Sequence, residues 1–303
     1  MEVAVLGSPT SWYLRDLQRA AGTHHRVTPA TFRDMAASVS STGQGCRSVG
    51  LNLGRCDAVL VRTMPPGSLE QVVFRMDVLA RLAAAGVIVL NPPRAVEAAV
   101  DKYLATARLQ AAGLRVPRTV VCQTAEEALL AFEELGRDVV VKPLFGSEGR
   151  GITRLQDAAL ADRAFRMLEQ LGAVIYLQEF VPHDGCDLRL LVIGDETLAM
   201  RRCNPHDWRT NVSRGATAEA FAPGDTLIDM ARRAAAAVEA PLAGVDILPG
   251  RDGELYLIEV NAVPGWRALS RATGKDVAGM VLGLVESMVA RAQGPPGIIH
   301  AQK

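Results

Sequence analysis

Hydrophobic runs alternate with amphipathic segments through the first part of the chain. Buried strands are predicted by the apolar runs at residues 1–7, 56–63 and 86–91. A helical spacing of apolar positions predicts helices at residues 12–21 and 72–86. Strands that alternate with helices are typical of a parallel sheet covered by helices. The pattern therefore predicts a small amino-terminal α/β domain over residues 1–94.

Two stretches interrupt this alternation. Residues 37–55 are rich in Ser and Gly and are interpreted as a loop. The first strand is followed by "LGSPTS" and not by G-x-G-x-x-G, so the sequence disfavours dinucleotide binding. The segment "NPPRA", residues 91–95, has the composition of a boundary, and we expect a second domain to begin near Arg94.

A glycine-rich turn follows in the second domain. Helices are predicted at residues 96–113 and 125–135, with a strand at 116–122 between them. Two strand-like runs within residues 138–155 then flank Gly146, Gly149 and Gly151. No helix follows these glycines, so they predict a β-hairpin flap whose N–H groups approach phosphate oxygens, and not a P-loop. A flexible hairpin turn is an equally weighted alternative.

Lysine is scarce in this sequence. Among the 33 basic residues, the lysines are Lys102, Lys142, Lys275 and Lys303. Lys142 follows three valines in a run with the pattern of a buried strand, where an ammonium group without a partner is costly. Its position therefore predicts an anion beside it. The alternative is an edge strand from which the lysine side chain reaches solvent.

The run "LYLIEVN", residues 255–261, combines a buried-strand pattern with two polar side chains. Because side chains alternate across a strand, one face is expected to carry Leu255, Leu257, Glu259 and Asn261. A hairpin loop at residues 249–254 would make Asp246 a diagonal neighbour of Glu259, whereas a five-residue loop would turn Asp246 to the opposite face. Carboxylate and amide oxygens together favour Mg²⁺ or Mn²⁺ over zinc.

Arginines collect in one polar segment, residues 201–216. It follows a predicted strand at 176–182 and a hairpin at 186–200 with "GD" at its turn. The segment contains Arg201, Arg202, Arg209 and Arg214 together with Asn211. Grouped guanidinium groups can clamp phosphate or carboxylate oxygens in a bidentate fashion. A solvated loop is the alternative interpretation.

Composition excludes several classes of function. The 303 residues suffice for two or three globular domains. The 33 basic residues balance the 33 acidic ones, which argues against a nucleic-acid partner. No apolar run approaches the roughly 20 residues needed to cross a bilayer, so no membrane association is expected. The amino end also lacks a signal core, and we expect a cytoplasmic protein.

The cysteines indicate neither a disulfide frame nor a zinc site. Without any C-x-x-C pair, we expect reduced structural thiols at Cys46, Cys56, Cys122, Cys186 and Cys203. Cys203 and His206 form a C-x-x-H pair, but no second pair accompanies it.

A series of motifs connects these features. In chain order they are Lys102 in "DK", Lys142 before the flap, "QEFV", "CDLRLLVIGDE", "RTN" with "RG", "GVDIL", "EVNAVPG" and "TGKDVAG". Over roughly residues 91–289 the series resembles the ATP-grasp superfamily, in particular the RimK-like α-L-glutamate ligases. The resemblance implies an α/β protein in which a Rossmann-like pre-ATP-grasp domain precedes an α+β ATP-grasp fold of two subdomains. The implied ranges are a lid at 95–180, a metal-binding subdomain at 181–292 and a flexible tail at 293–303.

The resemblance also implies roles for individual residues. ATP would be bound by Lys102, Lys142, Gly149, Gln178, Glu179, Phe180, Val181, Asp187, Arg209 and Asn211. The metal ligands, for two ions of Mg²⁺ or Mn²⁺, would be Asp246, Glu259 and Asn261. Arg189, Arg202 and Arg214 are the candidates for steadying the reacting groups.

The implied reaction is ATP-dependent joining of a carboxylate to an amine. An acceptor carboxylate would take the γ-phosphoryl group, and the amine of an amino acid, by resemblance L-glutamate, would then displace phosphate. The acceptor stays open among a ribosomal protein's carboxyl terminus, a pterin such as tetrahydromethanopterin, a deazaflavin and an amino-group carrier protein. A homo-oligomer is expected. The alternatives are a D-alanine ligase and a non-catalytic nucleotide-binding regulator of the same fold.

The chain departs from the family pattern after Asn261. Val263 stands where the family often has serine, and "WRALSR" follows "VPG". A glycine pair after an arginine has become Gly215 and Ala216. We expect Trp266 and Arg267 to alter the acceptor pocket.

Overall fold

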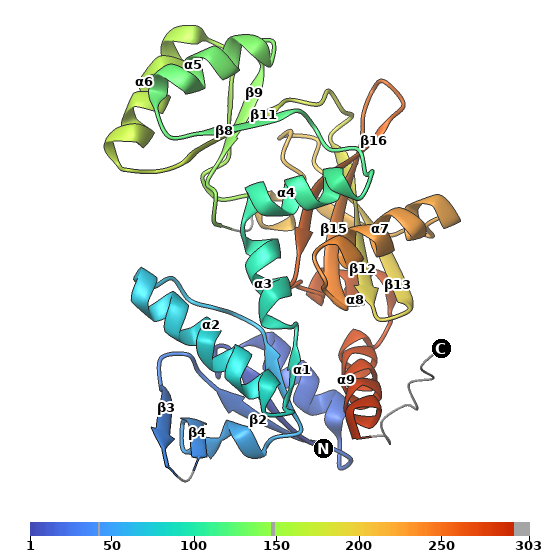
Figure 1. The fold of residues 1–303 in the computed structure, drawn as a ribbon. Coiled ribbons are helices and arrows are strands. Elements are labelled where there is room, and N and C mark those ends of the chain that lie inside the picture. The colour runs from blue at the N-terminus through green and yellow to red at the C-terminus, as the bar shows by residue number, and fades with distance from the viewer. Residues whose placement is uncertain (42, 147–148, 294–303) are drawn as a thin grey trace, which may run out of the picture. The chain divides into compact units, whose positions relative to one another are not determined.

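A computed structural model describes residues 1–41, 43–146 and 149–293 (Figure 1). The chain divides into two compact units, one of Met1–Pro93 with Asp276–Lys303 and the other of Arg94–Lys275. A break near Arg94 was expected. The sequence assigned residues 276–292 to the metal-binding subdomain, whereas in the structure they join the amino-terminal unit. The predicted flexible tail lies outside the described residues except for Gln293.

The first unit is built on a parallel sheet, as the alternating pattern predicted. Its strand order is β2-β1-β6-β7. The strands are β1 (Glu2–Leu6), β2 (Arg26–Ala30), β6 (Ala58–Val61) and β7 (Ile88–Leu90). The helices are α1 (Trp12–Ala21), α2 (Leu69–Ala84) and α9 (Val277–Gln293). Helix α9 joins this unit because it packs its apolar face against α1 and β7.

The interpretation of residues 37–55 as a loop is wrong. The segment forms a small antiparallel sheet of β3 (Met35–Ser40), β4 (Gly43–Ser48) and β5 (Leu51–Asn52), followed by the 3-10 turn η1 (Leu53–Arg55). Backbone hydrogen bonding pairs these strands although few of their side chains are apolar, so no hydrophobic alternation announced them.

The second unit begins with two helices, α3 (Pro93–Val100) and α4 (Lys102–Ala111), where the sequence predicted one. The break falls at Asp101, whose carboxylate accepts a hydrogen bond from the Leu104 N–H at 3.0 Å and caps α4. This cap makes Lys102 the first residue of α4.

The lid sheet of this unit has the strand order β10-β9-β11-β8. Its strands are β8 (Thr119–Cys122), β9 (Val139–Lys142), β10 (Thr153–Leu155) and β11 (Ile175–Glu179). Helices α5 (Ala125–Glu134) and α6 (Ala158–Gln170) cover one face, with Phe132 and Phe165 in the core between them (Figure 1). Strands β9 and β10 pair as an antiparallel hairpin, so the predicted β-hairpin is confirmed, whereas its role as a flap over phosphate stays a prediction; its residues Ser147 and Glu148 lie outside the described part.

The second sheet has the order β14-β13-β12-β15-β16. Its strands are β12 (Cys186–Ile193), β13 (Glu196–Cys203), β14 (Thr217–Ala220), β15 (Leu242–Pro249) and β16 (Leu255–Asn261). The remaining elements are η2 (Val212–Arg214), α7 (Asp225–Ala237) and α8 (Arg267–Thr273). One face packs on α4 and α7 through residues such as Leu190, Val245 and Leu257. The other face carries the polar side chains.

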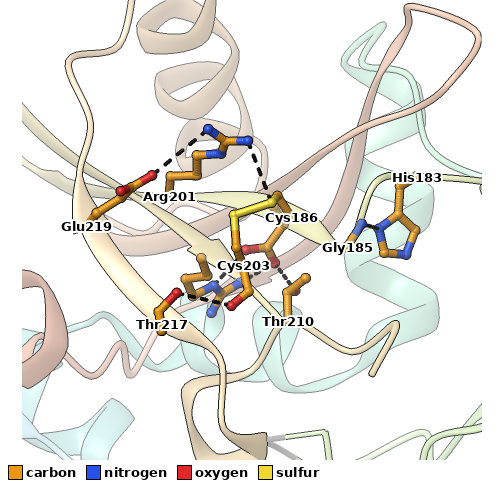
Figure 2. The surroundings of a disulfide bond; sticks show 10 residues. His183, Gly185, Cys186, Arg201, Cys203, Thr210, Thr217 and Glu219 are labelled. Atoms are coloured by element: carbon orange, nitrogen blue, oxygen red, sulfur yellow. Dashed lines mark hydrogen bonds and ion pairs between the residues drawn. A yellow bond between two sulfur atoms is a disulfide. The ribbon is translucent and has the colours of Figure 1, made fainter. Parts of the chain in front are cut away.

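The expectation that all cysteines are reduced is also wrong. Cys186 and Cys203 face each other across β12 and β13 and form a disulfide (Figure 2). Their spacing of 17 residues resembles no short-range motif, so only the strand register could have revealed the pair. Among the described helices, none is both long and apolar enough to cross a membrane.

Candidate functional site

Asp246 and Glu259 lie directly opposite each other on β15 and β16. The hairpin loop is the five-residue one, since Pro249 pairs with Leu255, and alone it would have turned Asp246 away from Glu259. A bulge changes this outcome. The register shifts between Asp246 and Ile247, so that Ile247 pairs with Leu257 and Asp246 with Glu259.

The bulge also corrects the predicted face of β16. Leu257 and Val260 both lie in the core against the helices, and the extra residue between Leu257 and Glu259 reverses the alternation. Glu259 and Asn261 therefore share the polar face with Asp246, while Leu257 does not. The expected polar side chains therefore share one face, but through a different register from the one predicted.

A buried ion-pair network spans the middle of this face. Arg189 Nη1 donates to Asp246 at 2.7 Å, and Arg202 Nη2 lies 3.0 Å from the same carboxylate. Arg202 also makes a bidentate pair with Asp187 at 2.7 and 2.5 Å, and the Thr210 hydroxyl donates to Asp187 at 2.6 Å. The predicted residues Arg189, Arg202, Asp187 and Asp246 are thus brought together. The oxygens of Asp187 are engaged by Arg202 and Thr210, so its contact with a ribose hydroxyl stays a prediction.

Glu259 is the carboxylate best suited to a cation. Burial raises its pKa, and the nearby Asp246 raises it further. At Asp246, burial also acts to raise the pKa, but Arg189 and Arg202 outweigh burial and the pKa is lowered. Bringing a divalent ion to Glu259 would relieve the cost of a buried charge beside a like charge.

The predicted metal ligands Asp246, Glu259 and Asn261 supply only part of the oxygen ligands that a hard cation needs. In the portion of the chain that the structure describes, no three His, Cys, Asp or Glu side chains form a metal-binding group. The predicted set has two carboxylates, and its third member, Asn261, accepts the Val263 N–H at 2.8 Å through its side-chain oxygen. Mg²⁺ is commonly held by one or two carboxylates together with substrate phosphates and water, which fits this set.

Lys142 is buried in an interior strand. Strand β9 lies between β10 and β11, and the side chain is 8% exposed, so the alternative of a lysine reaching solvent from an edge is wrong. Its Nζ donates to Gln178 Oε1 at 2.5 Å. Burial lowers the pKa of Lys142 to about 8, against an opposing effect of Glu259.

Lys102 approaches the same region from the start of α4. Its Nζ donates to the carbonyl oxygens of Gly146 at 3.0 Å and Leu144 at 3.4 Å, just beyond β9. Burial lowers its pKa, and Glu259 acts in the opposite direction. Among the described residues, neither Lys102 nor Lys142 lies within ion-pair distance of a carboxylate.

Gln178 and Glu179 turn to opposite sides of β11. The Gln178 side chain faces Lys142, whereas the Glu179 carboxylate accepts from the Arg118 backbone N–H at 2.8 Å and from its Nε at 2.6 Å. A contact of Glu179 with nucleotide would therefore be made by its backbone. Val181 is buried in the connection to the second sheet, and Phe180 stacks under the Arg154 guanidinium, 3.4 Å from the ring centroid.

The arginine segment contacts the flap. Arg209 Nη1 donates to the Ile152 carbonyl at 3.3 Å, and Arg214 Nη2 donates to the Gly149 carbonyl at 3.2 Å. Gly149 has φ +69°, and a β-carbon there would lie 2.5 Å from Asn211 Oδ1. Only glycine therefore fits this approach between flap and segment. Arg214 is exposed, as the alternative of a solvated loop would have it, but the segment also packs against the flap.

Some assignments changed or were missed. Trp266 is completely buried, so it does not line an accessible acceptor pocket. Arg201 lies with the disulfide, near Cys186 Sγ at 3.6 Å and Glu219 at 3.9 Å (Figure 2). The sequence did not single out Tyr176, although its spacing of two from Gln178 in a strand places both on one face.

The chain is similar in sequence to known ligases. The model of the RimK-like ATP-grasp domain matches residues 99–285. The tetrahydromethanopterin:α-L-glutamate ligase of Methanosarcina acetivorans is 33% identical over 267 residues, covering 78% of this chain and 82% of that protein. The ribosomal protein bS6–L-glutamate ligase of Escherichia coli is 31% identical over 201 residues, covering 65% of this chain and 67% of that protein.

A solved structure is similar over nearly the whole chain. The ATP-grasp ligase PsnB, in complex with a phosphomimetic variant of its minimal precursor, Mg and ADP, superposes with a TM-score of 0.71 at 25% identity. The match covers 94% of this chain and 97% of that one. Both sheets of the second unit thus belong to a fold that holds ADP and Mg in a relative.

Proposed function

Because the chain belongs to the RimK-like ATP-grasp family and is an ATP-dependent ligase, we propose that it joins L-glutamate to an acceptor carboxylate through an acyl phosphate. The observation that carries the proposal is that two chemically different groups of side chains lie close together in one unit, since Glu259 acts against burial to raise the pKa of both Lys102 and Lys142. The lid sheet offers the buried Lys142 and helix α4 the partly buried Lys102, neither of them paired with a carboxylate among the described residues, and the second sheet offers Glu259 and Asp246. Phosphate oxygens and a divalent ion complement these surfaces.

Two displacements make up the proposed reaction. An oxygen of the acceptor carboxylate attacks the γ-phosphorus of ATP, and the bond to the β,γ-bridging oxygen breaks to release ADP. The neutral amine of glutamate then attacks the acyl carbon. The bond between the acyl carbon and the phosphate oxygen breaks, inorganic phosphate leaves with the electron pair of that bond, and the nitrogen loses a proton to solvent. No covalent enzyme intermediate is required, since the protein contributes alignment and charge stabilisation.

The residues divide this work by position. Lys142 and Lys102 bind triphosphate oxygens, with the backbone of Glu179, Phe180 and Val181 beside the purine. Asp246, Glu259 and Asn261 would hold Mg²⁺ or Mn²⁺, for which we propose two ions, and a bound ion would supply positive charge against the phosphates. Arg189 and Arg202 present guanidinium groups to the reacting oxygens from a network that is already paired and therefore rigid.

Arg214, Arg209 and Asn211 hold the flap against the nucleotide. Their contacts in this structure reach Gly149 and Ile152, on the arm of the flap that leads into β10. Closing a flap over an acyl phosphate excludes water that would otherwise hydrolyse it.

For the acceptor, a small cofactor of the tetrahydromethanopterin type is the proposal that the similarity supports best. Ligation of glutamate to tetrahydromethanopterin is the activity named for the relative of Methanosarcina acetivorans, which has the highest identity to this chain among those described above. A protein carboxyl terminus is the second candidate, supported by the named activity of the Escherichia coli relative.

A substrate screen tests the proposal. Purified protein with Mg-ATP is supplied with each amino acid and with acceptors of both kinds, and ADP release is measured. We expect release only when L-glutamate and one acceptor are both present. ADP release that depends on another amino acid would retain the ligase but contradict glutamate, and AMP as the product would contradict the acyl phosphate.

A further inference from the structure

A chain of hydrogen bonds between neutral groups leads from Lys142 through Gln178 to Thr119. The chemistry of these groups decides which atom donates and which accepts in each bond. The Thr119 hydroxyl lies 2.9 Å from the Pro117 carbonyl oxygen. Because a carbonyl oxygen can only accept, Thr119 donates its proton to this hydrogen bond. Thr119 must therefore accept from Gln178 Nε2 at 3.0 Å. The Gln178 carbonyl oxygen is left to face Lys142, which can only donate.

The second N–H of the Gln178 amide points to Tyr176. Gln178 Nε2 donates to the Tyr176 hydroxyl oxygen at 3.2 Å, and the same hydroxyl group forms a hydrogen bond with Thr106 Oγ1 at 2.9 Å, in which either oxygen can donate. Tyr176 is 1% exposed and Gln178 is 2% exposed, so water cannot readily replace either partner. With the amide reversed, its NH₂ group would face the Lys142 ammonium group and repel it.

Thr106 links this chain to the other lysine. It lies four residues after Lys102 on α4, on the same side of the helix. The bond between Thr106 and Tyr176 therefore ties β11 to the helix whose first residue is Lys102. Lys102 in turn reaches the carbonyl oxygens that follow β9, the strand of Lys142.

We infer that Tyr176 and Thr106 are positioning residues, which hold the Gln178 amide in one orientation so that the Lys142 ammonium group points at the bound nucleotide. The inference rests on the proposed role of Lys142 in ATP binding. Lys142 uses one of its three N–H groups on Gln178 and has two left for an anion. Gln178, placed by the resemblance at the nucleotide, would act on it through Lys142.

Losing the Tyr176 hydroxyl group would leave one Gln178 N–H without its acceptor in a buried place. The amide could then rotate, and the orientation of Lys142 would no longer be unique. We expect Tyr176→Phe to weaken binding of a non-hydrolysable ATP analogue with Mg²⁺ about three- to tenfold, the size of one neutral hydrogen bond. Thr106→Val should weaken it less, because the tyrosine would keep its bond from Gln178, and Thr106→Ser should restore wild-type affinity.

The matched control is Tyr256→Phe. Tyr256 also makes a hydrogen bond through its hydroxyl group, to Asp252 at 2.6 Å, but it lies at the exposed β15–β16 hairpin and outside this chain of bonds. Affinities are measured by calorimetry and thermal stability by melting, for each variant alone and combined with Lys142→Ala. Because the effect passes through the lysine, the loss caused by Tyr176→Phe should shrink toward onefold when Lys142 is absent, while its effect on melting persists.

Two kinds of result would contradict the inference, and they can be told apart. A Tyr176→Phe affinity equal to wild type, or the same loss with and without Lys142, would overturn the inference and leave nucleotide binding intact. Failure of the wild-type protein to bind the analogue would contradict the proposed function and the inference together.

Discussion

The two sheets of the second unit hold their charged groups in opposite ways. On the β12–β16 face, each buried arginine is paired with a carboxylate, as in the contacts of Arg189 and Arg202 with Asp246. On the lid sheet, Lys142 meets only the neutral Gln178 amide among the described residues, and Lys102, at the start of α4, meets backbone carbonyls beside that sheet. The buried arginines of the first face are balanced without a ligand, whereas the two lysines keep charge that an anion would balance.

This difference indicates which of the two surfaces is stabilised when the nucleotide binds. A buried ion pair fixes guanidinium groups in place before any substrate arrives. A buried ammonium group without a carboxylate costs free energy in the empty protein, and part of that cost is recovered when phosphate binds. The paired arginines of the β12–β16 sheet are therefore held in place before the nucleotide binds, whereas the buried Lys142 of the lid sheet is stabilised by its binding.

Glu259 should show the largest effect, because it belongs to the paired face but has no guanidinium partner of its own among the residues that the structure describes. Glu259→Gln keeps the shape and removes the charge that holds the metal. Turnover should fall by two orders of magnitude or more, about the loss seen when a group that stabilises developing charge is removed. Glu254→Gln, on the same hairpin but paired with Arg115 in solvent, is the control. Near-normal ADP release at saturating Mg²⁺ would exclude Glu259 as a ligand.

Removing one cation from each face should move stability in different directions. Arg202→Met leaves Asp187 and Asp246 without a shared partner and should cost about 3–5 kcal/mol of unfolding free energy. Lys142→Met removes a buried charge, so the melting temperature should stay level or rise while analogue binding weakens. Arg201→Met, at an exposed neighbour of Arg202, should change little. Equal destabilisation by Arg202→Met and Lys142→Met would remove the contrast between the two faces.

The disulfide provides a smaller effect on the paired face. Cys186 and Cys203 adjoin Asp187 and Arg202 in sequence, and the bond closes a loop with a separation of 17 residues. Its reduction should cost roughly 2–3 kcal/mol, measured as a lower midpoint of unfolding. Alkylation of the unfolded, unreduced protein should modify Cys46, Cys56 and Cys122 only. Modification of Cys186 and Cys203 in the same experiment would show that the bond does not form.

Proton uptake on nucleotide binding should be the smallest effect. With a pKa of about 8 in the empty protein, Lys142 is about half neutral at pH 8, and bound phosphate raises the pKa so that a proton is taken up. At pH 6 the lysine is already charged and uptake at this group should vanish. Calorimetry in buffers of different ionisation enthalpy measures this uptake. An uptake at pH 8 that survives in Lys142→Met would assign it to another group.

The sequence predicted the chemistry of these faces better than their geometry. Residue types and order indicated Lys142, Asp246 and Glu259, because a buried-strand pattern makes a charged residue conspicuous. The sequence could not predict the bulge before Glu259, because a register shift in a short strand does not change the hydrophobic pattern in a recognisable way. The break at Asp101 and the disulfide also depend on local capping and strand pairing, which hydrophobic spacing does not encode.

Oxygen transfer tests the proposed reaction most directly. The acceptor found in the substrate screen is labelled with ¹⁸O in its carboxylate and incubated with Mg-ATP, L-glutamate and the protein. Since a carboxylate oxygen attacks the γ-phosphorus and leaves with phosphate, we predict one ¹⁸O atom in each released inorganic phosphate, with ADP as the nucleotide product. Unlabelled phosphate, or ¹⁸O recovered in AMP, would contradict an acyl phosphate intermediate.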